Sequence, residues 1–559
     1  MSHRAVSAAI AVAVLGASVA GGVPLMANEL AATDRERAII AASRPADAPH
    51  FHGARVVGVR PGTPLLHALA VSGRRPIRFE ADGLPAGLTL DSDSGILSGI
   101  LAKPGKHTVA VRARNAFGFA SSTLRVEAGS ALALSPPMGW NSYDAFGDCV
   151  TEAEVLANAR WMQDRVQPMG WDLVTVDFRW YDRLADGVRV QDPEGNTLDA
   201  FGRMIPAPNR FPSSAGGAGF APLAAKLHAM GLKLGIHIMR GIPRRAVDAN
   251  APIEGTRYHA ADAVAPISDP NRECAWNRDM YGVDAGTPAG KAWYAGLARQ
   301  YAAWGVDFIK CDDMLDLQRG RHYGGAEVEA LADGLKRCGR SITLSLSPGP
   351  APVNASRHLQ QHASMWRISG DFWDNWPALD RQFDLFADWM PDVAPGSWSD
   401  GDTLPLGHIC VRNCDVRPAR WTRFTRDEQL TMLSLWALAS SPLLVGANLP
   451  ECDEWTAALL TNPAVLAVDQ DPVARPARRM RGAPITGEIW RKDLADGSTA
   501  YGFFNRTEAP IHVEAPWSWL GYPKPPAVRD LWTGADLGRR PTFAVDLAPH
   551  ACTLVKTTR

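Results

Sequence analysis

Apolar and polar positions follow three different patterns along the chain. From Phe51 to Ala128, short runs alternate apolar and polar residues and are separated by glycine, proline and Asp-Ser turns. Between about Ser135 and Asp471, short apolar runs alternate with longer segments of helical periodicity, and beyond Asp471 only short alternating runs remain. Alternation with a period of two is typical of half-buried strands, and a period near 3.6 is typical of amphipathic helices. The pattern therefore predicts a β-domain, an α/β domain and a second β-domain.

The α/β region contains eight short apolar runs, each ending in polar or aromatic residues. They are residues 136–143, 173–177, 232–237, 304–314, 342–347, 365–371, 397–404 and 441–445. Helix-like segments lie between them, and the one from Thr151 to Met162 opens with a Thr-x-x-Glu capping box. Eight strands that alternate with helices are typical of a (β/α)8 TIM barrel. A doubly wound open sheet is the alternative, but no Gly-x-Gly-x-x-Gly follows an early strand.

We therefore expect a multidomain chain, with a (β/α)8 TIM barrel, an N-terminal β-sandwich and a C-terminal antiparallel β-domain. The expected boundaries are 1–27 for a signal peptide, 28–49 for a linker or short helix, 50–130 for an immunoglobulin-like β-sandwich, 131–472 for the barrel and 473–559 for the C-terminal domain. With 559 residues, the chain is too long for one ordinary domain, in agreement with this division.

The first residues are typical of an export signal. Arg4 precedes the apolar run Ala5–Val19, which is too short to span a bilayer comfortably, and small residues at 18–20 or Ala27 offer cleavage sites. A retained N-terminal membrane anchor is the alternative. No later segment is apolar enough for a transmembrane helix, so no stable membrane span is expected after signal removal. The prediction is an exported bacterial protein, periplasmic or secreted.

Composition excludes some partners and leaves others open. Lys and Arg number 58 against 59 Asp and Glu, so no basic surface field points to nucleic acid. The 19 tryptophans suit stacking on sugar rings, although they also fill cores.

Cys410 and Cys414 are close enough for a local disulfide, and Cys311 is expected to be a buried thiol. Without Cys-x-x-Cys or His-Glu-x-x-His, we expect no metal or organic cofactor.

Candidate chemistry gathers at the ends of the predicted strands, which in a barrel share one open face. The residues expected to project into it are Asp177, Asp312, Asp371, Asp402, Lys310, Arg367, His237, Trp140, Tyr143 and Trp180. Carboxylates, cations and indoles together suit a neutral, polyhydroxylated ligand. The alternatives are structural ion pairs, plain packing of the aromatic residues, and an Asp402 that only braces the seventh strand.

Two of the aspartates fit the two roles that cleavage of a glycosidic bond requires. Lys310 lies beside Asp312 in the sequence and would keep it ionised, as a nucleophile needs. Asp371 follows Gly370 and precedes Phe372 and Trp373, and this apolar setting would keep its carboxyl protonated as an acid.

Five stretches, in chain order, resemble glycoside hydrolase family 27, the family of retaining α-galactosidases and α-N-acetylgalactosaminidases. They are residues 136–143, 231–237, 304–312, 366–371 and 462–470. The resemblance implies that Asp312 is the nucleophile and Asp371 the acid/base, and that Lys310, Arg367 and Asp177 contact sugar hydroxyls. Near the N-terminus, Leu-Pro-Ala-Gly-Leu followed by Gly-Ile-Leu-Ser-Gly resembles the immunoglobulin-like modules of bacterial secreted enzymes.

The chain departs from this family at residues that contact the sugar and determine which sugar is bound. Family α-galactosidases carry two adjacent aspartates after the second strand, which help to hold the axial 4-hydroxyl and the 6-hydroxyl of galactose; here Asp177 is followed by Phe178. Tyr143 stands in place of a tryptophan, His237 in place of a tyrosine and Met314 in place of a half-cystine. The catalytic pair is kept while the sugar-reading residues differ.

The sequence thus predicts an exo-acting retaining glycoside hydrolase that binds an oligosaccharide or polysaccharide side chain, with α-galactosidase activity favoured. An isomalto-dextranase, a β-L-arabinopyranosidase and an α-N-acetylgalactosaminidase are the alternatives within the same mechanism. A non-catalytic carbohydrate-binding protein and a metal-dependent hydrolase with aspartate ligands are the alternatives from other classes. The oligomeric state stays open.

Overall fold

The structure is a computed structural model that describes residues 32–185, 188–189, 195–274, 276–315, 322–412, 418–480 and 487–559. The predicted signal peptide (1–27) and Cys414, one half of the predicted bridge to Cys410, lie outside the described residues. Among the helices described, none is long and apolar enough to cross a membrane.

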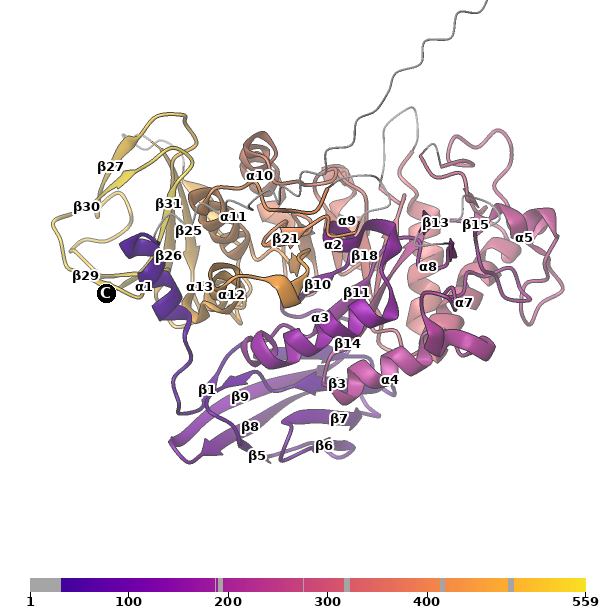
Figure 1. Cartoon of the computed structure of the whole chain (residues 1–559), viewed down its shortest axis with the longest axis horizontal. Helices are drawn as coiled ribbons and strands as arrows, with labels where there is room; N and C mark the ends of the chain where they lie inside the picture. Colours follow the sequence, from indigo (N-terminus) through magenta and orange to yellow (C-terminus); the bar gives the residue numbers. More distant parts are fainter. Residues whose placement is uncertain are drawn as a thin grey trace, which may run out of the picture.

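Eight parallel strands form the central sheet, which confirms the predicted barrel (Figure 1). In chain order they are β10 (Met138–Asn141), β11 (Leu173–Val176), β14 (Lys233–Met239), β17 (Phe308–Asp312), β18 (Thr343–Leu346), β19 (Met365–Arg367), β20 (Trp398–Asp400) and β23 (Leu443–Val445). Each strand from β10 to β19 pairs with the next one in the chain, and β23 pairs with β10. A parallel bridge between Leu404 and Val445 closes the remaining seam, beyond the end of β20.

Helices cover the outside of the barrel, as the helical periodicity predicts. They include α3 (Glu152–Arg165), α4 (Ala221–Ala229), α7 (Pro288–Ala303), α8 (Gly325–Arg337), α9 (Ser356–His362), α10 (Trp376–Trp389), α11 (Arg426–Ala439), α12 (Glu454–Thr461) and α13 (Pro463–Asp469). The capping box expected at Thr151 is present at the start of α3. At least ten of the 19 tryptophans are fully buried, so most of the indoles serve the core and not a sugar surface.

The N-terminal β-sandwich lies against the end of the barrel at which the strands begin (Figure 1). One sheet has the order β2 (Val56–Val59), β9 (Gly118–Ala128), β8 (Gly105–Asn115), β5 (Arg78–Asp82), and the other β3 (Pro64–Ala68), β7 (Ile96–Ile100), β6 (Leu88–Leu90). Alternate residues such as Val109, Val111 and Phe79 fill the core between the sheets. The Arg60 amide and the Thr63 hydroxyl bond the Ser341 hydroxyl at 2.8 and 2.7 Å, which fixes the sandwich to the barrel.

The C-terminal domain is antiparallel, as predicted. Its main sheet has the order β24 (Arg478–Met480), β25 (Glu488–Asp493), β26 (Thr499–Phe504), β31 (Cys552–Thr558), β28 (Ala527–Asp530), β29 (Asp536–Gly538), and β27 (Ile511–Pro516) pairs with β30 (Thr542–Leu547). Buried Lys492 donates hydrogen bonds to the carbonyls of Ala437 and Val468 at 2.9 and 2.6 Å. These bonds tie the domain to α11 and α13.

Within residues 28–49, where a linker or short helix is expected, the structure contains helix α1 (Asp34–Ser43). A capping box between Thr33 and Glu36 begins the helix, and Ile39 is fully buried in the main core. Arg35 donates to the Cys552 carbonyl at 2.8 Å. The segment is therefore packed against the barrel helices and the C-terminal domain, because Ile39 supplies an apolar anchor in an otherwise polar stretch.

Candidate active site

The C-terminal ends of the barrel strands surround a cavity of about 480 Å³. Eight of the ten predicted site residues line it: Tyr143, Asp177, His237, Lys310, Asp312, Arg367, Asp371 and Asp402. A volume of this size lies in the usual range for small-molecule sites, and the carboxylates and cations around it are the groups expected to bind hydroxyls. The strand-end reasoning thus brings most of the predicted residues together.

Asp312 ends strand β17 and is held through both carboxylate oxygens. His237 Nε2 lies 3.0 Å from one oxygen, and the Asp313 amide donates to the other at 2.8 Å. Burial opposes ionisation, but the hydrogen bond and charge of His237, the charge of Lys310 and the Asp313 amide outweigh it and lower the pKa of Asp312. The carboxylate is therefore kept ionised and oriented.

Lys310 shares the inward face of β17 with Asp312, because residues two apart point to the same side of a strand. Its direct ion pair is with Asp177, whose Oδ2 lies 3.0 Å from Nζ. Asp177 also accepts a hydrogen bond from Asn141 Nδ2 at 2.6 Å. Burial opposes the charged form of each partner, but their mutual attraction lowers the pKa of Asp177 and raises that of Lys310. The side chain in direct contact with the nucleophile candidate is thus His237, and Lys310 acts on it from farther away.

Arg367 lies at the end of β19, with its guanidinium almost fully buried. Nη1 pairs with Asp402 Oδ1 at 2.6 Å, and Nη2 lies 3.5 Å from Asp371 Oδ1. The other oxygen of Asp402 accepts from the Phe372 amide at 2.8 Å. Burial raises the pKa of Asp402 to about 6, although Arg367 and Lys310 oppose this. Asp402 therefore fixes both Arg367 and the backbone that carries Asp371, and does more than brace the seventh strand.

The environment expected around Asp371 differs from the one observed. Its side chain is 72% exposed, so the apolar setting read from the neighbouring residues is wrong. Phe372 and Trp373 both belong to the lining of the cavity, but the Phe372 ring is buried, 5.2 Å from that of Trp436 and 5.9 Å from that of Phe424. Residues adjacent in a loop can point in different directions, so the environment of the Asp371 carboxyl could not be predicted from its neighbours in the sequence. The exposed position leaves Asp371 open to a leaving group and to water.

Trp140 and Trp180 do not line the cavity, which corrects their prediction as sugar-binding residues. Both are buried, and each indole N–H donates to a barrel carbonyl: Trp140 to Ala447 at 2.7 Å and Trp180 to His237 at 2.6 Å. A buried indole requires a partner for its N–H, and backbone carbonyls supply it here. The two rings pack between the strands and the helix layer.

An aromatic wall that the sequence did not identify as such lines one side of the cavity. Phe178 has its ring 5.2 Å from that of His237 and 5.7 Å from that of Trp276. Trp276 is 44% exposed and lines the cavity too. Phe178 stands where family α-galactosidases carry the second aspartate, so an apolar surface occupies a place expected to bind a hydroxyl. Trp276 lies in the long segment between the barrel strands β14 and β17, far from the end of either, and no local pattern marked it.

Asp144, in the short helix α2 (Tyr143–Phe146), is a cavity residue missed by sequence analysis. The Thr403 hydroxyl donates to Oδ1 at 3.3 Å, while Oδ2 is buried without a hydrogen-bond partner among the described residues. Burial, with the charges of Asp402 and Asp177, raises the pKa of Asp144 to about 8, although Lys310 opposes this. Asp144 is therefore a neutral carboxylic acid at pH 7. Its place directly after Tyr143 at a strand end was the available signal.

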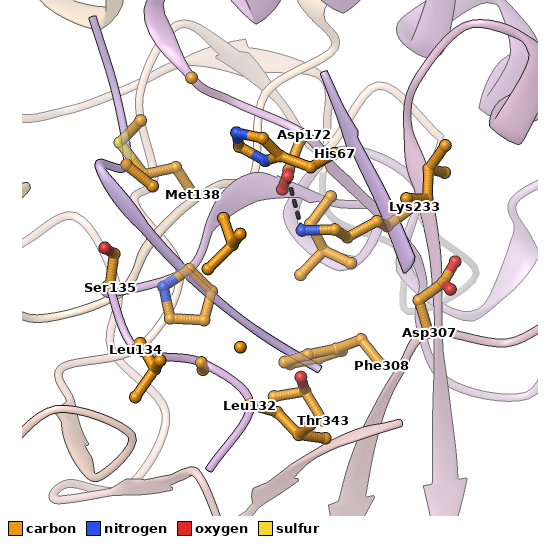
Figure 2. A pocket seen from close by; sticks show the side chains of 18 of the residues that line it. His67, Leu132, Leu134, Ser135, Met138, Asp172, Lys233, Asp307, Phe308 and Thr343 are labelled. Atoms are coloured by element: carbon orange, nitrogen blue, oxygen red, sulfur yellow. Dashed lines mark hydrogen bonds and ion pairs between the residues drawn. The ribbon is translucent and has the colours of Figure 1, made fainter. Parts of the chain in front are cut away.

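A second cavity, of about 130 Å³, lies at the opposite end of the barrel, where the β-sandwich meets the beginnings of the strands. Figure 2 shows its lining, with His67, Asp172 and Lys233 near one another and Leu132, Leu134 and Phe308 around the rest. The Lys233–Asp172 ion pair, at 2.6 Å, spans neighbouring strands. The cavity is below the usual size of a ligand site, so it marks an interface between domains.

The two cavities therefore differ in what they can do chemically. The larger one holds an ionised, oriented carboxylate and a second, exposed carboxyl on different strands, with cations and aromatic rings around them. This arrangement suits nucleophilic attack at one carbon and proton transfer to its leaving group. Of its other carboxylates, Asp177 is paired with Lys310 and Asp402 with Arg367. A group of side chains that could hold a metal lies elsewhere, at Glu329, His358 and His362.

Family models match all three domains. Residues 279–471 match the model described as alpha galactosidase A, residues 486–557 match the alpha galactosidase C-terminal beta sandwich domain, and residues 56–128 match an Ig domain family.

Known proteins and solved structures are also similar to the chain. It is 43% identical to a GH27 β-L-arabinopyranosidase from Geobacillus stearothermophilus, whose crystal structure matches with a TM-score of 0.72 over 76% of this chain and 97% of that one. Alpha-galactosidase 2 from Arabidopsis thaliana is 26% identical over 77% of this chain and 90% of its own length. The alpha-N-acetylgalactosaminidase from Mus musculus is 28% identical over 70% of this chain and 82% of its own.

Proposed function

Because the chain belongs to glycoside hydrolase family 27, we propose that it is an exo-acting retaining glycosidase for terminal β-L-arabinopyranosyl residues. The observation that carries the choice of sugar is the 43% identity to the β-L-arabinopyranosidase from Geobacillus stearothermophilus, against 26% to Alpha-galactosidase 2 from Arabidopsis thaliana. A variant of the Geobacillus enzyme has been crystallised in complex with arabinose.

The aromatic wall supports the same sugar. β-L-Arabinopyranose has the ring and hydroxyl configuration of α-D-galactopyranose but carries hydrogen where galactose has its hydroxymethyl group. A pentopyranose therefore needs no partner for a 6-hydroxyl, and the Phe178 ring, which has no polar atom, can lie against that side of the sugar. Asp177, bound to Lys310 and Asn141, is still in place for the 4-hydroxyl.

In the proposed reaction the two carboxyl groups act in sequence. An Asp312 oxygen attacks the anomeric carbon, the glycosidic C–O bond breaks, and the leaving oxygen takes the proton of Asp371. The Asp371 carboxylate then takes a proton from water, the water oxygen attacks the anomeric carbon, and Asp312 leaves. Two inversions give net retention. His237 keeps the Asp312 oxygen oriented for attack, with Nε2 at 3.0 Å.

The test is hydrolysis of p-nitrophenyl β-L-arabinopyranoside and p-nitrophenyl α-D-galactopyranoside by the same preparation. We expect a higher kcat/KM on the arabinoside, and NMR of the first-formed sugar should show the β-anomer. Phe178→Asp, which restores a carboxylate at this wall, should shift the ratio toward the galactoside by about tenfold or more. Phe178→Leu, which keeps the wall apolar, is the matched control and should leave the preference unchanged.

An α-galactosidase, favoured by the sequence analysis, is the second candidate, because the curated relatives named above include one. A higher kcat/KM on the galactoside, with Phe178→Asp unable to improve it further, would establish it in place of the arabinosidase. Binding of both sugars without turnover would instead support a carbohydrate-binding protein and contradict the proposal.

A further inference from the structure

Two helices on the outside of the barrel each present a pair of metal-ligand residues four positions apart. Glu329 and Asp333 lie on α8, and His358 and His362 lie on α9. Residues four apart share one face of a helix, and α8 and α9 pack against each other. The two helices follow β17 and β18, and none of these four side chains lines the glycosidase cavity.

Three of these side chains converge. Ligand atoms of Glu329, His358 and His362 all lie within 4.8 Å of one another. His358 Nε2 is 3.0 Å from Glu329 Oε1, and its Nδ1 is 2.8 Å from the Tyr323 hydroxyl. The two imidazole rings are stacked, with centroids 4.5 Å apart and planes at 30°.

His362 has an unused donor or acceptor in this cluster. Its Nδ1 is buried and has no hydrogen-bond partner among the described residues. That ring nitrogen is therefore available to a ligand without the loss of an existing hydrogen bond. A neutral imidazole beside a second imidazole and a carboxylate is the form in which histidine binds a metal ion.

We propose that Glu329, His358 and His362 form a binding site for a divalent transition-metal ion of the zinc type. Two imidazole nitrogens and one carboxylate oxygen are ligands that Zn²⁺ accepts, with water in the fourth position. The Tyr323 oxygen can accept the Nδ1–H of His358, which directs the Nε2 lone pair at the metal and resembles the outer hydrogen bond of protein zinc sites.

The geometry requires only side-chain movement. Tetrahedral zinc with bonds of about 2.0–2.2 Å brings its ligand atoms to about 3.4 Å from one another. The atoms here lie up to 4.8 Å apart, and the Glu329 side chain is 57% exposed and free to rotate toward the rings. The sequence did not reveal the site, because its ligands come from two helices with about thirty residues between them and no zinc motif.

Metal binding here would join α8, which follows the strand of Asp312, to α9 without entering the cavity. We therefore expect zinc to raise the melting temperature of the whole chain by about 2 °C or more, since a ligand that binds only the folded state stabilises it. Glycosidase activity should be equal with zinc and with EDTA.

The experiment uses the full chain without a histidine tag, stripped with EDTA and titrated with ZnCl₂ against a chromophoric chelator. We expect one tight zinc ion per chain, at least about tenfold weaker binding in His362→Gln and in Glu329→Gln, and loss of the site in the His358→Gln/His362→Gln double variant. Because Glu329 is an exposed residue, its variant should fold normally. His512→Gln is the matched control, because His512 forms another exposed histidine–carboxylate pair, with Asp546 at 2.7 Å.

The alternative is a plain hydrogen-bonded cluster, in which His358 Nε2–H donates to Glu329. In that case the stripped chain would take up no zinc, or the double variant and His512→Gln would retain the wild-type stoichiometry and affinity. Either result would overturn the proposal. Both are independent of the sugar that the enzyme hydrolyses, so a failure here leaves the proposed glycosidase function untouched.

Discussion

An aspartate stands at each end of strand β17: Asp307, directly before it, lies beside the β-sandwich, and Asp312, its last residue, lies at the open cavity. Their side chains are 12% and 15% exposed. Each contacts a histidine Nε2, His228 at 2.7 Å for Asp307 and His237 at 3.0 Å for Asp312. For both, burial opposes ionisation and the polar partners outweigh it, so the pKa of each is lowered. Burial, pKa and hydrogen bonding therefore do not tell a nucleophile from a structural ion.

Access and the nature of the partners do distinguish the two. Asp307 accepts from the Leu234 amide at 2.9 Å and pairs with the permanently charged Arg340, and it lies at the 130 Å³ cavity. Asp312 has one contact per oxygen and faces 480 Å³. At the end of the barrel that holds Asp307, the charged groups pair with one another and the cavity is small. At the end that holds Asp312, the cavity is large and its carboxylates can contact a ligand.

The largest effect that tests this contrast comes from the two matched substitutions Asp312→Asn and Asp307→Asn. We expect Asp312→Asn to lower kcat on the arabinoside by a factor on the order of 10⁴ to 10⁶, since it removes the nucleophile, with little loss of stability. Asp307→Asn should keep kcat within about twofold and lower the free energy of unfolding by about 2–4 kcal/mol, because Arg340 loses its charge partner. The measurements are kcat and urea unfolding of both variants, and equal loss of activity in both would contradict the comparison.

A smaller effect is expected at Asp371, which shares the open cavity but is exposed. Asp371→Gly should lower kcat/KM by about 10²- to 10⁴-fold, less on substrates with a good leaving group, because these need less protonation. Its melting temperature should match that of the wild type. Sodium azide should restore turnover and give the β-arabinosyl azide, whereas azide with Asp312→Gly should give the α-azide. The same azide anomer from both variants would reject the assignment of roles.

These residues also show how far the sequence could predict the site. Alternation along β17 places Lys310 and Asp312 on the inner face, and the ends of the eight strands bring the other carboxylates together. The hydrophobic period and the position of each residue in its strand were therefore enough to predict this part of the site. The hydrogen-bond partner of Asp312 could not be predicted from these patterns. His237 lies on the neighbouring strand β14, and its contact depends on the register between β14 and β17. The directions of Trp140, Trp180 and Phe372 depend on which backbone or core groups they meet, and a linear pattern does not contain that information.

The histidines at the two ends extend the comparison to stability. His67, at the closed end, is buried, and its Nδ1 has no hydrogen-bond partner among the described residues. Burial and the charge of Lys233 lower its pKa to about 4, while Asp172 opposes this. Because the ordinary value is 6.5, the unfolded chain binds the proton first, and stability falls as the pH drops from about 6.5 to 4.

We expect His67→Gln to reduce this acid-induced loss by up to about 3 kcal/mol, because glutamine does not titrate. The measurement is the free energy of unfolding of wild type and variant at pH 7 and pH 4, with His512→Gln as the exposed control. Activity at pH 7 should be unchanged, since His67 lies at the opposite end from the cavity of Asp312. Identical acid profiles for the variant and the wild type would show that the β-sandwich interface does not oppose protonation.

Among the carboxyl groups of the open cavity, the smallest effect on activity is expected at Asp144, which tests whether every one of them acts as an anion. Because the ordinary value is 3.8 and the folded value is about 8, the unfolded chain releases this proton first, so stability falls steadily as the pH rises from about 4 to 8. Asp144→Asn keeps the neutral form, so kcat/KM at pH 6 should stay within about threefold of the wild type. Between pH 5 and 8 the wild type should lose melting temperature because of this carboxyl, and the variant, which has no proton to release, should not show that part of the decline. The measurement is thermal unfolding of the wild type and Asp144→Asn from pH 5 to 9. Equal slopes of melting temperature against pH would mean that Asp144 is ionised throughout and that the open end tolerates one more unmatched anion.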